Sequence, residues 1–286
     1  MTTSRKFAYG VGATALLAFF AFHTVPALQG FFYSLTNYKG YGDWEFVGLK
    51  NYELLFSDAR IGHAYWFTFK FAIVAALLTN VLSLALAVGL NGRIAFRKTL
   101  RGLFFVPNIL SLLIVGYIFN FIFSSAVPQI GSALGVDELS TSILGNPDLA
   151  WLGIVVVAVW GSTAVTTIIY LAGLQTVPVE VYEAASLDGA TGWRRFSRIT
   201  FPMIMPFVTI NTLLTVKGFL MVFDQIVAMT GGGPGDATRS MSVLIFSAGF
   251  NAGEFAYQSA NAIIFFIVIA LVSLVQVRTM RSRERV

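Results

Sequence analysis

The stretch Glu183–Pro202, which reads EAASLDGATGWRRFSRITFP, is a polar interruption between two apolar segments, yet it has the pattern of a folded element. Pro178 and Glu180 favour a helix start, because the first turn of a helix tolerates a missing N–H and its positive end attracts a carboxylate. Gly189 is typical of the left-handed residue that ends a helix. We therefore expect one short helix before Gly189 and a second from about Thr191.

Both predicted helices are too short to be stable by themselves in water, so each needs something to pack against. One alternative is that the loop lies on the membrane surface, with Arg194, Arg195 and Arg198 at lipid headgroups. A surface-lying helix needs bulky apolar residues, whereas this loop has Ala184 and Ala185. We therefore expect the first helix to dock into another protein, since small residues permit close backbone approach.

The composition of the whole chain is that of an integral membrane protein. The chain has 286 residues, of which 56% are hydrophobic and only 12% are charged, and its mean hydropathy is +0.75. A soluble domain of this length cannot bury so much apolar surface. The absence of cysteine excludes disulfides, thiolate metal sites and cysteine nucleophiles.

Six apolar runs are long enough to cross about 30 Å of hydrocarbon at about 20 residues each. They cover residues 7–35, 64–90, 102–123, 151–174, 203–229 and 256–277. We expect every run to be helical, because unpaired backbone polar groups cannot face lipid. The predicted fold is an all-α bundle of six transmembrane helices in one domain over residues 1–286, with residues 175–202 as a long loop.

Lysine and arginine are unevenly distributed over the predicted loops, which indicates how the chain is oriented. One side holds four of them: Lys39, Lys50, Arg60 and Arg239. The other side holds thirteen: Arg5, Lys6, Arg93, Arg97, Lys98, Arg101, Arg194, Arg195, Arg198, Arg278, Arg281, Arg283 and Arg285. Both termini and the 175–202 loop are therefore predicted to be cytoplasmic, and the net charge of +5 reflects topology and not a nucleic-acid partner.

At this loop the chain resembles the inner-membrane permease subunits of ABC importers. Their signature is EAA, three residues, Gly, nine residues, Ile, two residues and Pro, and it is matched by Glu183, Ala184, Ala185, Gly189, Ile199 and Pro202. Phe201 stands where the family usually has Leu. The resemblance implies the type I permease fold and a loop that inserts into a cleft of an ATP-hydrolysing subunit. The residues that it places in this contact are Glu183, Ala184, Ala185, Asp188 and Gly189.

Two further runs narrow the resemblance to permeases for carbohydrates. Residues 46–52 read FVGLKNY, which looks like the run after the first span in these proteins, although the residues alone also suit an interfacial segment with aromatic anchors. Phe223-Asp224 and the later run Thr230–Pro234, TGGGP, resemble the segment that follows their fifth span. Permeases for phosphate esters such as glycerol phosphate are similar, so the exact solute stays open.

No enzyme motif occurs in the chain. It lacks HExxH, GxSxG and the Walker sequence, and the TGGGP run lacks the Gly-Lys-Ser/Thr ending of a phosphate-binding loop. We therefore expect neither catalytic residues nor a metal or cofactor on this chain. The resemblance implies that ATP and Mg²⁺ bind to a separate ATPase subunit.

A solute path through the bundle should be lined by polar and aromatic groups, because sugars offer hydroxyls and apolar ring faces. Six residues of the fifth run share one helical face: Asn211, Thr215, Gly218, Phe219, Val222 and Ile226. The resemblance points to this face, with Thr215, Phe219 and Val222 as path residues. The fourth run adds Trp160, Ser162 and Thr166. Ordinary packing between membrane helices is the alternative for all of these residues.

Three charges lie within the predicted spans. Lys217 and Asp224 are seven residues apart and about 10 Å apart along a continuous helix, on a face roughly opposite Thr215 and Phe219. We expect both to contact other helices or a vestibule, since charges within spans face a cavity or a partner. Lys70 is expected to extend toward the outer membrane surface.

The resemblance implies a permease subunit in the cell membrane, in contact with lipid. Its implied partners are a second permease, two ATP-binding subunits and an extracytoplasmic binding protein that delivers a carbohydrate. A second copy of the chain or a related chain could be the second permease. The alternatives are an ion-coupled secondary carrier, for which the sequence offers no repeat or paired intramembrane carboxylates, and a structural or receptor-like membrane protein.

Overall fold

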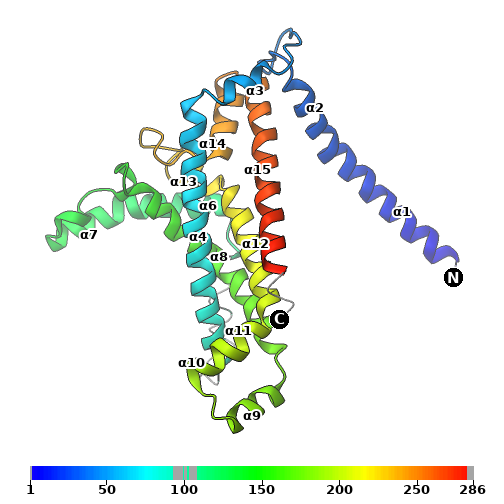
Figure 1. Ribbon diagram of the computed structural model, residues 1–286. Helices are drawn as coiled ribbons and strands as arrows, with labels where there is room; N and C mark the ends of the chain where they lie inside the picture. Colours follow the sequence, from blue (N-terminus) through cyan, green and yellow to red (C-terminus); the bar gives the residue numbers. More distant parts are fainter. Residues whose placement is uncertain (1, 93–98, 100–101, 103–107, 282–286) are drawn as a thin grey trace. The chain divides into compact units, whose positions relative to one another are not determined.

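The computed structural model describes residues 2–92, 99, 102 and 108–281, which form helices and connecting loops (Figure 1). The principal helices are α1 (Thr2–Phe19), α2 (Val25–Tyr33), α3 (Lys50–Leu55), α4 (Ala59–Asn91), α6 (Leu112–Phe121), α7 (Val127–Leu134), α8 (Ala150–Gln175), α9 (Val179–Leu187), α10 (Gly192–Arg195), α11 (Phe201–Met203), α12 (Met205–Leu220), α13 (Asp224–Met229), α14 (Met241–Phe246) and α15 (Phe255–Arg281). Of the basic residues counted above, Arg93, Arg97, Lys98, Arg101, Arg283 and Arg285 lie outside the described residues.

Within the described part of the chain, five helical stretches are long and apolar enough to cross a membrane: Tyr9–Tyr33, Ala59–Asn91, Leu112–Leu134, Ala150–Gln175 and Phe255–Met280. The pair Gly192–Met203 and Met205–Leu220, bent by 72°, would be a sixth if it is one broken span. The all-α prediction is confirmed, and the count of six spans stays a prediction. The predicted fourth run, 151–174, agrees with α8 to within one residue at each end.

The third predicted run, 102–123, differs from the described helix mainly at its end, because the helix continues past residue 123. Residues 103–107 lie outside the described residues, and the described helix begins at Leu112 and continues through α7 to Leu134. Pro128 does not end this helix, because it lies in the first turn of α7, directly after a π-helical turn at Ile122–Ala126. The wider turn already interrupts the regular hydrogen bonds there, so a proline costs little.

The fifth predicted run, 203–229, is not one continuous helix. It bends at Ile204, where Pro206 in the first turn of α12 cannot donate to the preceding turn. It then ends at Leu220, and α13 begins only at Asp224. The Ser240 hydroxyl donates to the Val222 carbonyl (2.8 Å), so a partner from elsewhere in the chain satisfies a backbone group that the break exposes.

The chain divides into two compact units, Met1–Gly62 with Leu244–Val268 and His63–Val243 with Ile269–Val286. In the first unit, residues of the FVGLKNY run (46–52) form hydrogen bonds that hold the loop after α2 in place. The Asn51 amide donates to the carbonyls of Ser34 (2.8 Å) and Thr36 (2.7 Å), and the Tyr52 and Ser34 hydroxyls are hydrogen-bonded (2.7 Å). This run therefore has a structural role within the first unit.

The second unit has an apolar core to which α4, α6, α8, α12 and α13 all contribute. Phe71, Ile154 and Ile226 are fully buried in it. Helices α6 and α13 approach closely at Gly116, where an added Cβ would lie 2.5 Å from the Ala228 side chain. This packing holds the short helix α13 in place beyond the end of α12.

Candidate functional site

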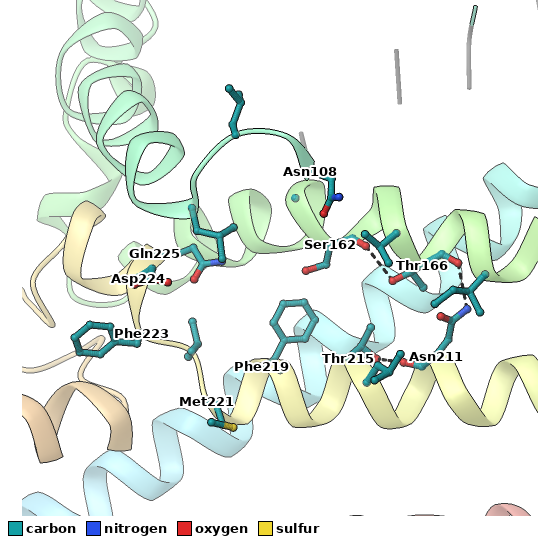
Figure 2. Close-up of a pocket in the computed structure, with 18 residues that line it drawn as sticks. Asn108, Ser162, Thr166, Asn211, Thr215, Phe219, Met221, Phe223, Asp224 and Gln225 are labelled. Carbon is teal, nitrogen blue, oxygen red and sulfur yellow. Dashed lines mark hydrogen bonds between the residues drawn. The ribbon is translucent and has the colours of Figure 1, made fainter. Parts of the chain in front are cut away.

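A cavity of about 390 Å³ opens in the second unit beside α8, α12 and the break before α13 (Figure 2). Its lining is a mixture of small, polar and aromatic residues. The lining residues are Asn108, Leu110, Leu112, Gly161, Ser162, Val165, Thr166, Ile169, Asn211, Leu214, Thr215, Gly218, Phe219, Met221, Val222, Phe223, Asp224 and Gln225.

One end of the cavity is bordered by a polar network that we define as Asn80, Thr166, Tyr170, Asn211 and Thr215. The side-chain amide of Asn80 donates to the Thr215 hydroxyl (2.8 Å), and the Tyr170 hydroxyl donates to the side-chain oxygen Oδ1 of Asn80 (2.7 Å). The Thr215 hydroxyl donates to the Asn211 carbonyl (2.8 Å), and the Asn211 amide donates to the Thr166 carbonyl (3.1 Å). These bonds join α4, α8 and α12 and fix the shape of this end.

The polar side chains at the other end are unengaged. Among the described residues, no hydrogen bond or ion pair holds the side chains of Asp224 and Gln225, and both are partly exposed. In the view of Figure 2 they lie on one side of the Phe219 ring, and Thr215 and Asn211 lie on the other. At one end of the cavity the polar groups are therefore hydrogen-bonded within the protein, and at the other end they are free to bind a ligand.

Most of the predicted path residues come together at this cavity. Thr215, Phe219, Val222 and Ser162 line it, and so do Asn211, Thr166 and Gly218. Trp160 does not line it, since its ring packs against Phe119 with centroids 5.5 Å apart. Ile226 was placed on the same face but is fully buried in the core, because the helix breaks before it. Whether the lining residues bind a solute stays a prediction.

Of the three charges within the predicted spans, Asp224 lies differently from the expectation. Asp224 lines the cavity together with Phe219, because the break after Leu220 turns it away from the face it would share with Lys217 on a continuous helix. Lys217 is exposed on α12. The Lys70 ammonium lies 3.9 Å from the centroid of the Trp151 ring, in the first turn of α8, a cation–π contact. Its extension toward the outer membrane surface stays a prediction.

The 175–202 loop forms the two helices that the sequence predicts. Helix α9 begins after Pro178, Gly189 adopts a left-handed φ of 71°, and α10 begins at Gly192. Figure 1 shows α9 and α10 beyond the ends of α8 and α12. Tyr182 anchors α9, because its ring packs against the core cluster that includes Leu174.

The exposed surface of this loop is more apolar than expected. Leu187 is 90% exposed, Trp193 77% and Val179 65%. Of the two alanines, Ala184 is exposed and Ala185 is buried, so only one is free to approach another protein. Glu183, Asp188 and Gly189 are exposed, and the Glu183 carboxylate has no partner among the described residues.

A charged cluster in the first unit was not anticipated from the sequence. The Arg60 guanidinium pairs with Asp58 (2.8 Å) and Glu254 (3.1 Å), and the Tyr257 hydroxyl donates to Asp58 (3.0 Å). The hydrogen bonds from Arg60 lower the pKa of the Asp58 carboxyl. Among the described residues, no group of three His, Asp or Glu side chains could hold a metal ion.

Asn80, Tyr170 and Gln225 were also missed as site residues. Asn80 carries a weak signal, because an amide in an apolar span must find a hydrogen-bond partner on a neighbouring helix. Tyr170 and Gln225 carry none, since their place depends on how α8 packs and where α12 ends.

Comparison with known proteins matches residues 79–283 to the family described as the binding-protein-dependent transport system inner membrane component. The chain belongs to this family. Among similar permeases is the multiple sugar-binding transport system permease protein MsmF of Streptococcus mutans, 36% identical over 264 residues, which are 92% of this chain and 91% of MsmF. The trehalose/maltose transport system permease protein MalF of Thermococcus litoralis is 35% identical over 84% of this chain and 81% of its own length.

The fold of the permease is also similar to that of solved transporters. A chain of a bacterial alginate ABC transporter, in complex with an alginate pentasaccharide-bound periplasmic protein, superposes with a TM-score of 0.85 at 21% identity. The match covers 99% of this permease and 96% of that chain. The all-α permease fold predicted for the chain is thus confirmed, whereas the number of spans and the side on which the termini lie stay predictions.

Proposed function

We propose that this permease is the membrane-spanning subunit of an ATP-driven importer for a carbohydrate that an extracytoplasmic binding protein delivers. The cavity carries this proposal. It combines hydroxyl, amide and carboxylate groups with the Phe219 ring, the chemistry that suits sugar hydroxyls and ring faces. The similar permeases named for sugar transport support it.

The charge of the cavity favours a neutral sugar over a phosphate ester. Asp224 lines it, whereas no lysine or arginine occurs in its described lining. Phosphate groups are usually held by arginine, lysine or clustered backbone N–H groups. A carboxylate near a phosphate would instead repel it.

The cavity is bordered by surface that a second permease would cover. Leu214 and Met221 line it and are each 52% exposed. Lys217 is exposed between them on α12, where a charge is expected to face protein or water and not lipid. A second permease subunit placed against this face would complete the enclosure of a sugar.

The 175–202 loop would transmit the movement of the ATPase subunits to the membrane helices. Two ATP-binding subunits, which would hold ATP and Mg²⁺, would dock on the cytoplasmic loops of the permease pair and contact Glu183, Ala184, Asp188 and Gly189. Because Tyr182 packs α9 against a core cluster built from α4, α8 and Ile204, a push on α9 reaches α8 and the start of α12. These two helices carry most of the cavity, so their rocking would open it alternately to either side.

This function is tested by reconstituting the permease with its second permease, ATPase and binding protein in proteoliposomes. Radiolabelled maltose, trehalose and raffinose serve as probes. We expect uptake that requires both ATP inside the liposomes and the binding protein. Uptake of any probe driven by a proton gradient without ATP would favour a secondary carrier instead, and ATP hydrolysis without uptake of any probe would overturn the carbohydrate assignment.

A further inference from the structure

We infer that Asp224 and Gln225, at the break between α12 and α13, are the residues that bind the hydroxyls of the transported carbohydrate, and that Thr215 and Asn211 instead hold the scaffold. This inference rests on the proposed function and names the specificity-determining groups of the same cavity. The sequence analysis named Thr215 as a residue of the solute path, whereas this inference gives it a structural role.

Thr215 has little hydrogen-bonding capacity to offer a ligand. A hydroxyl has one donor and two acceptor sites. The Thr215 donor goes to the Asn211 carbonyl, and one acceptor site takes the Asn80 amide. Only 7% of Thr215 is exposed. Its hydroxyl is therefore used within the protein.

The side chains of Thr166 and Asn211 are used in the same way. The Thr166 hydroxyl donates to the Ser162 carbonyl (2.9 Å), and the Asn211 amide donates to the Thr166 carbonyl. Asn211 is 1% exposed. A sugar that bound here would have to break bonds that join α8 to α12, which costs more than it gains.

Asp224 and Gln225 have the opposite properties. A carboxylate offers two oxygens that accept from hydroxyls, and the amide of Gln225 both donates and accepts. No partner within the described residues occupies either side chain, and both residues line the cavity on the same side of Phe219 (Figure 2). Phe219 also lines the cavity, but it is only 5% exposed and its ring packs against Phe71 in the core. The acid and the amide are therefore the groups that remain for a ligand.

The break in the helix creates this arrangement. On a continuous helix Asp224 would face away from Phe219 and Thr215, as the periodicity of the sequence predicts. Because α12 ends at Leu220 and Ser240 holds the Val222 carbonyl, the chain turns and brings Asp224 to the same cavity as Phe219. The packing of α13 against α6 then keeps it there.

The absence of cysteine from the chain allows a direct test by single-cysteine variants of the permease in its complete complex. Asp224→Cys and Gln225→Cys are exposed to a water-soluble maleimide in nanodiscs, with Ala158→Cys, 1% exposed, as the buried control. We expect both cavity variants to be labelled, the control to stay unlabelled, and the transported probe sugar to slow the labelling of the two cavity positions. Labelling of Asp224→Cys and Gln225→Cys no faster than that of Ala158→Cys would overturn the inference even if no sugar is transported.

Uptake by conservative variants separates a binding role from a structural one. Asp224→Asn is expected to slow uptake of the probe sugar by about tenfold to a hundredfold, and Gln225→Leu by about tenfold, since each removes hydrogen bonds made to the ligand. Stimulation of the ATPase by the loaded binding protein and assembly of the complex should be retained. Asp148→Asn, an exposed carboxylate outside the cavity, is the matched control.

Two results contradict the inference while the proposed function survives. One is uptake by Asp224→Asn within about twofold of wild type, a change too small for the loss of a charged hydrogen bond. The other is loss of complex assembly in this variant, which would make Asp224 a contact to the second permease. Absence of uptake by the wild-type complex would instead count against the proposed function alone.

Discussion

The polar network at one end of the cavity and the 175–202 loop both interrupt an apolar bundle, but their polar groups differ in whether they have partners within the chain. At the cavity, Asn80, Tyr170 and Thr215 find their partners within the chain. On the loop, Glu183 has no partner among the described residues, and Leu187 and Trp193 are largely exposed. The first region is complete by itself, whereas the second has the unfinished surface of a protein interface.

This difference separates residues that hold the fold from residues that act. A substitution in the polar network should change stability before it changes coupling. A substitution on the exposed part of the loop should change coupling without changing stability. The following predictions test this division from the largest expected effect to the smallest.

Glu183→Lys should remove most of the coupling between ATP hydrolysis and uptake. Loss of a charge partner in a buried interface costs about 2–5 kcal/mol, which corresponds to a fall in ATP-driven uptake of roughly thirtyfold or more. The spans should stay folded, since Glu183 is exposed in the isolated subunit. Uptake and ATPase activity in proteoliposomes measure the effect, with Glu180→Lys in the first turn of α9 as the control. Unchanged uptake in Glu183→Lys would contradict the role of the loop.

Leu187→Ser should weaken binding of the ATPase subunits by roughly tenfold to a hundredfold, because burial of a leucine side chain contributes about 1.5–3 kcal/mol. The thermal stability of the isolated permease should not fall, since Leu187 is already 90% exposed. Binding is measured by titrating the ATPase onto the permease in nanodiscs. Phe56→Ser, which changes an 85% exposed aromatic residue of the first unit, should leave the affinity unaltered. Equal affinity of Leu187→Ser and wild type would mean that this side chain stays outside the interface.

Asn80→Leu should destabilise the second unit by about 1–3 kcal/mol, because it leaves the Tyr170 and Thr215 hydroxyls without their shared partner. The melting temperature of the purified permease should fall by about 2–4 °C for each kcal/mol. Leu77→Ala on the exposed side of α4 is the control. A variant as stable as wild type, with uptake abolished, would show that Asn80 acts on the ligand and not on the scaffold.

Asp58→Asn should have the smallest effect, because Arg60 is 47% exposed and the ion pair is screened by water. The Arg60 hydrogen bonds lower the pKa of Asp58 in the folded state. Its ionised form therefore stabilises the fold above about pH 4, and this contribution is lost as the pH falls through the folded pKa. Thermal unfolding should show a wild-type advantage at pH 7 that disappears at low pH. An advantage that grows toward low pH would contradict the sign.

The sequence alone predicts the 175–202 loop well, because its signals are local. Pro178 and Gly189 limit α9 through their own backbone preferences. Four of the six apolar runs also predict their helices closely, since lipid forces every backbone group of a span to pair within it. Periodicity also brings Thr215 and Phe219 to the cavity, because both lie on the continuous part of α12.

Asp224 and Gln225 could not be placed in this way. Periodicity extends a helix until a local signal stops it, and residues 221–223 carry neither proline nor glycine. The break depends on Ser240, which lies 18 residues later and binds the Val222 carbonyl, and on the packing of α13 against α6. Neither contact can be seen in the order of residues around the break.

By itself, the sequence determined the family of this protein, its helical class and the shape of its 175–202 loop, because those depend on hydrophobicity, capping residues and a fixed motif. Only the tertiary structure decided which polar groups of the cavity are already bonded and which remain for a ligand. That outcome depends on hydrogen bonds between α4, α8 and α12 and on the end of a helix set by a distant serine, which are properties of the packed chain.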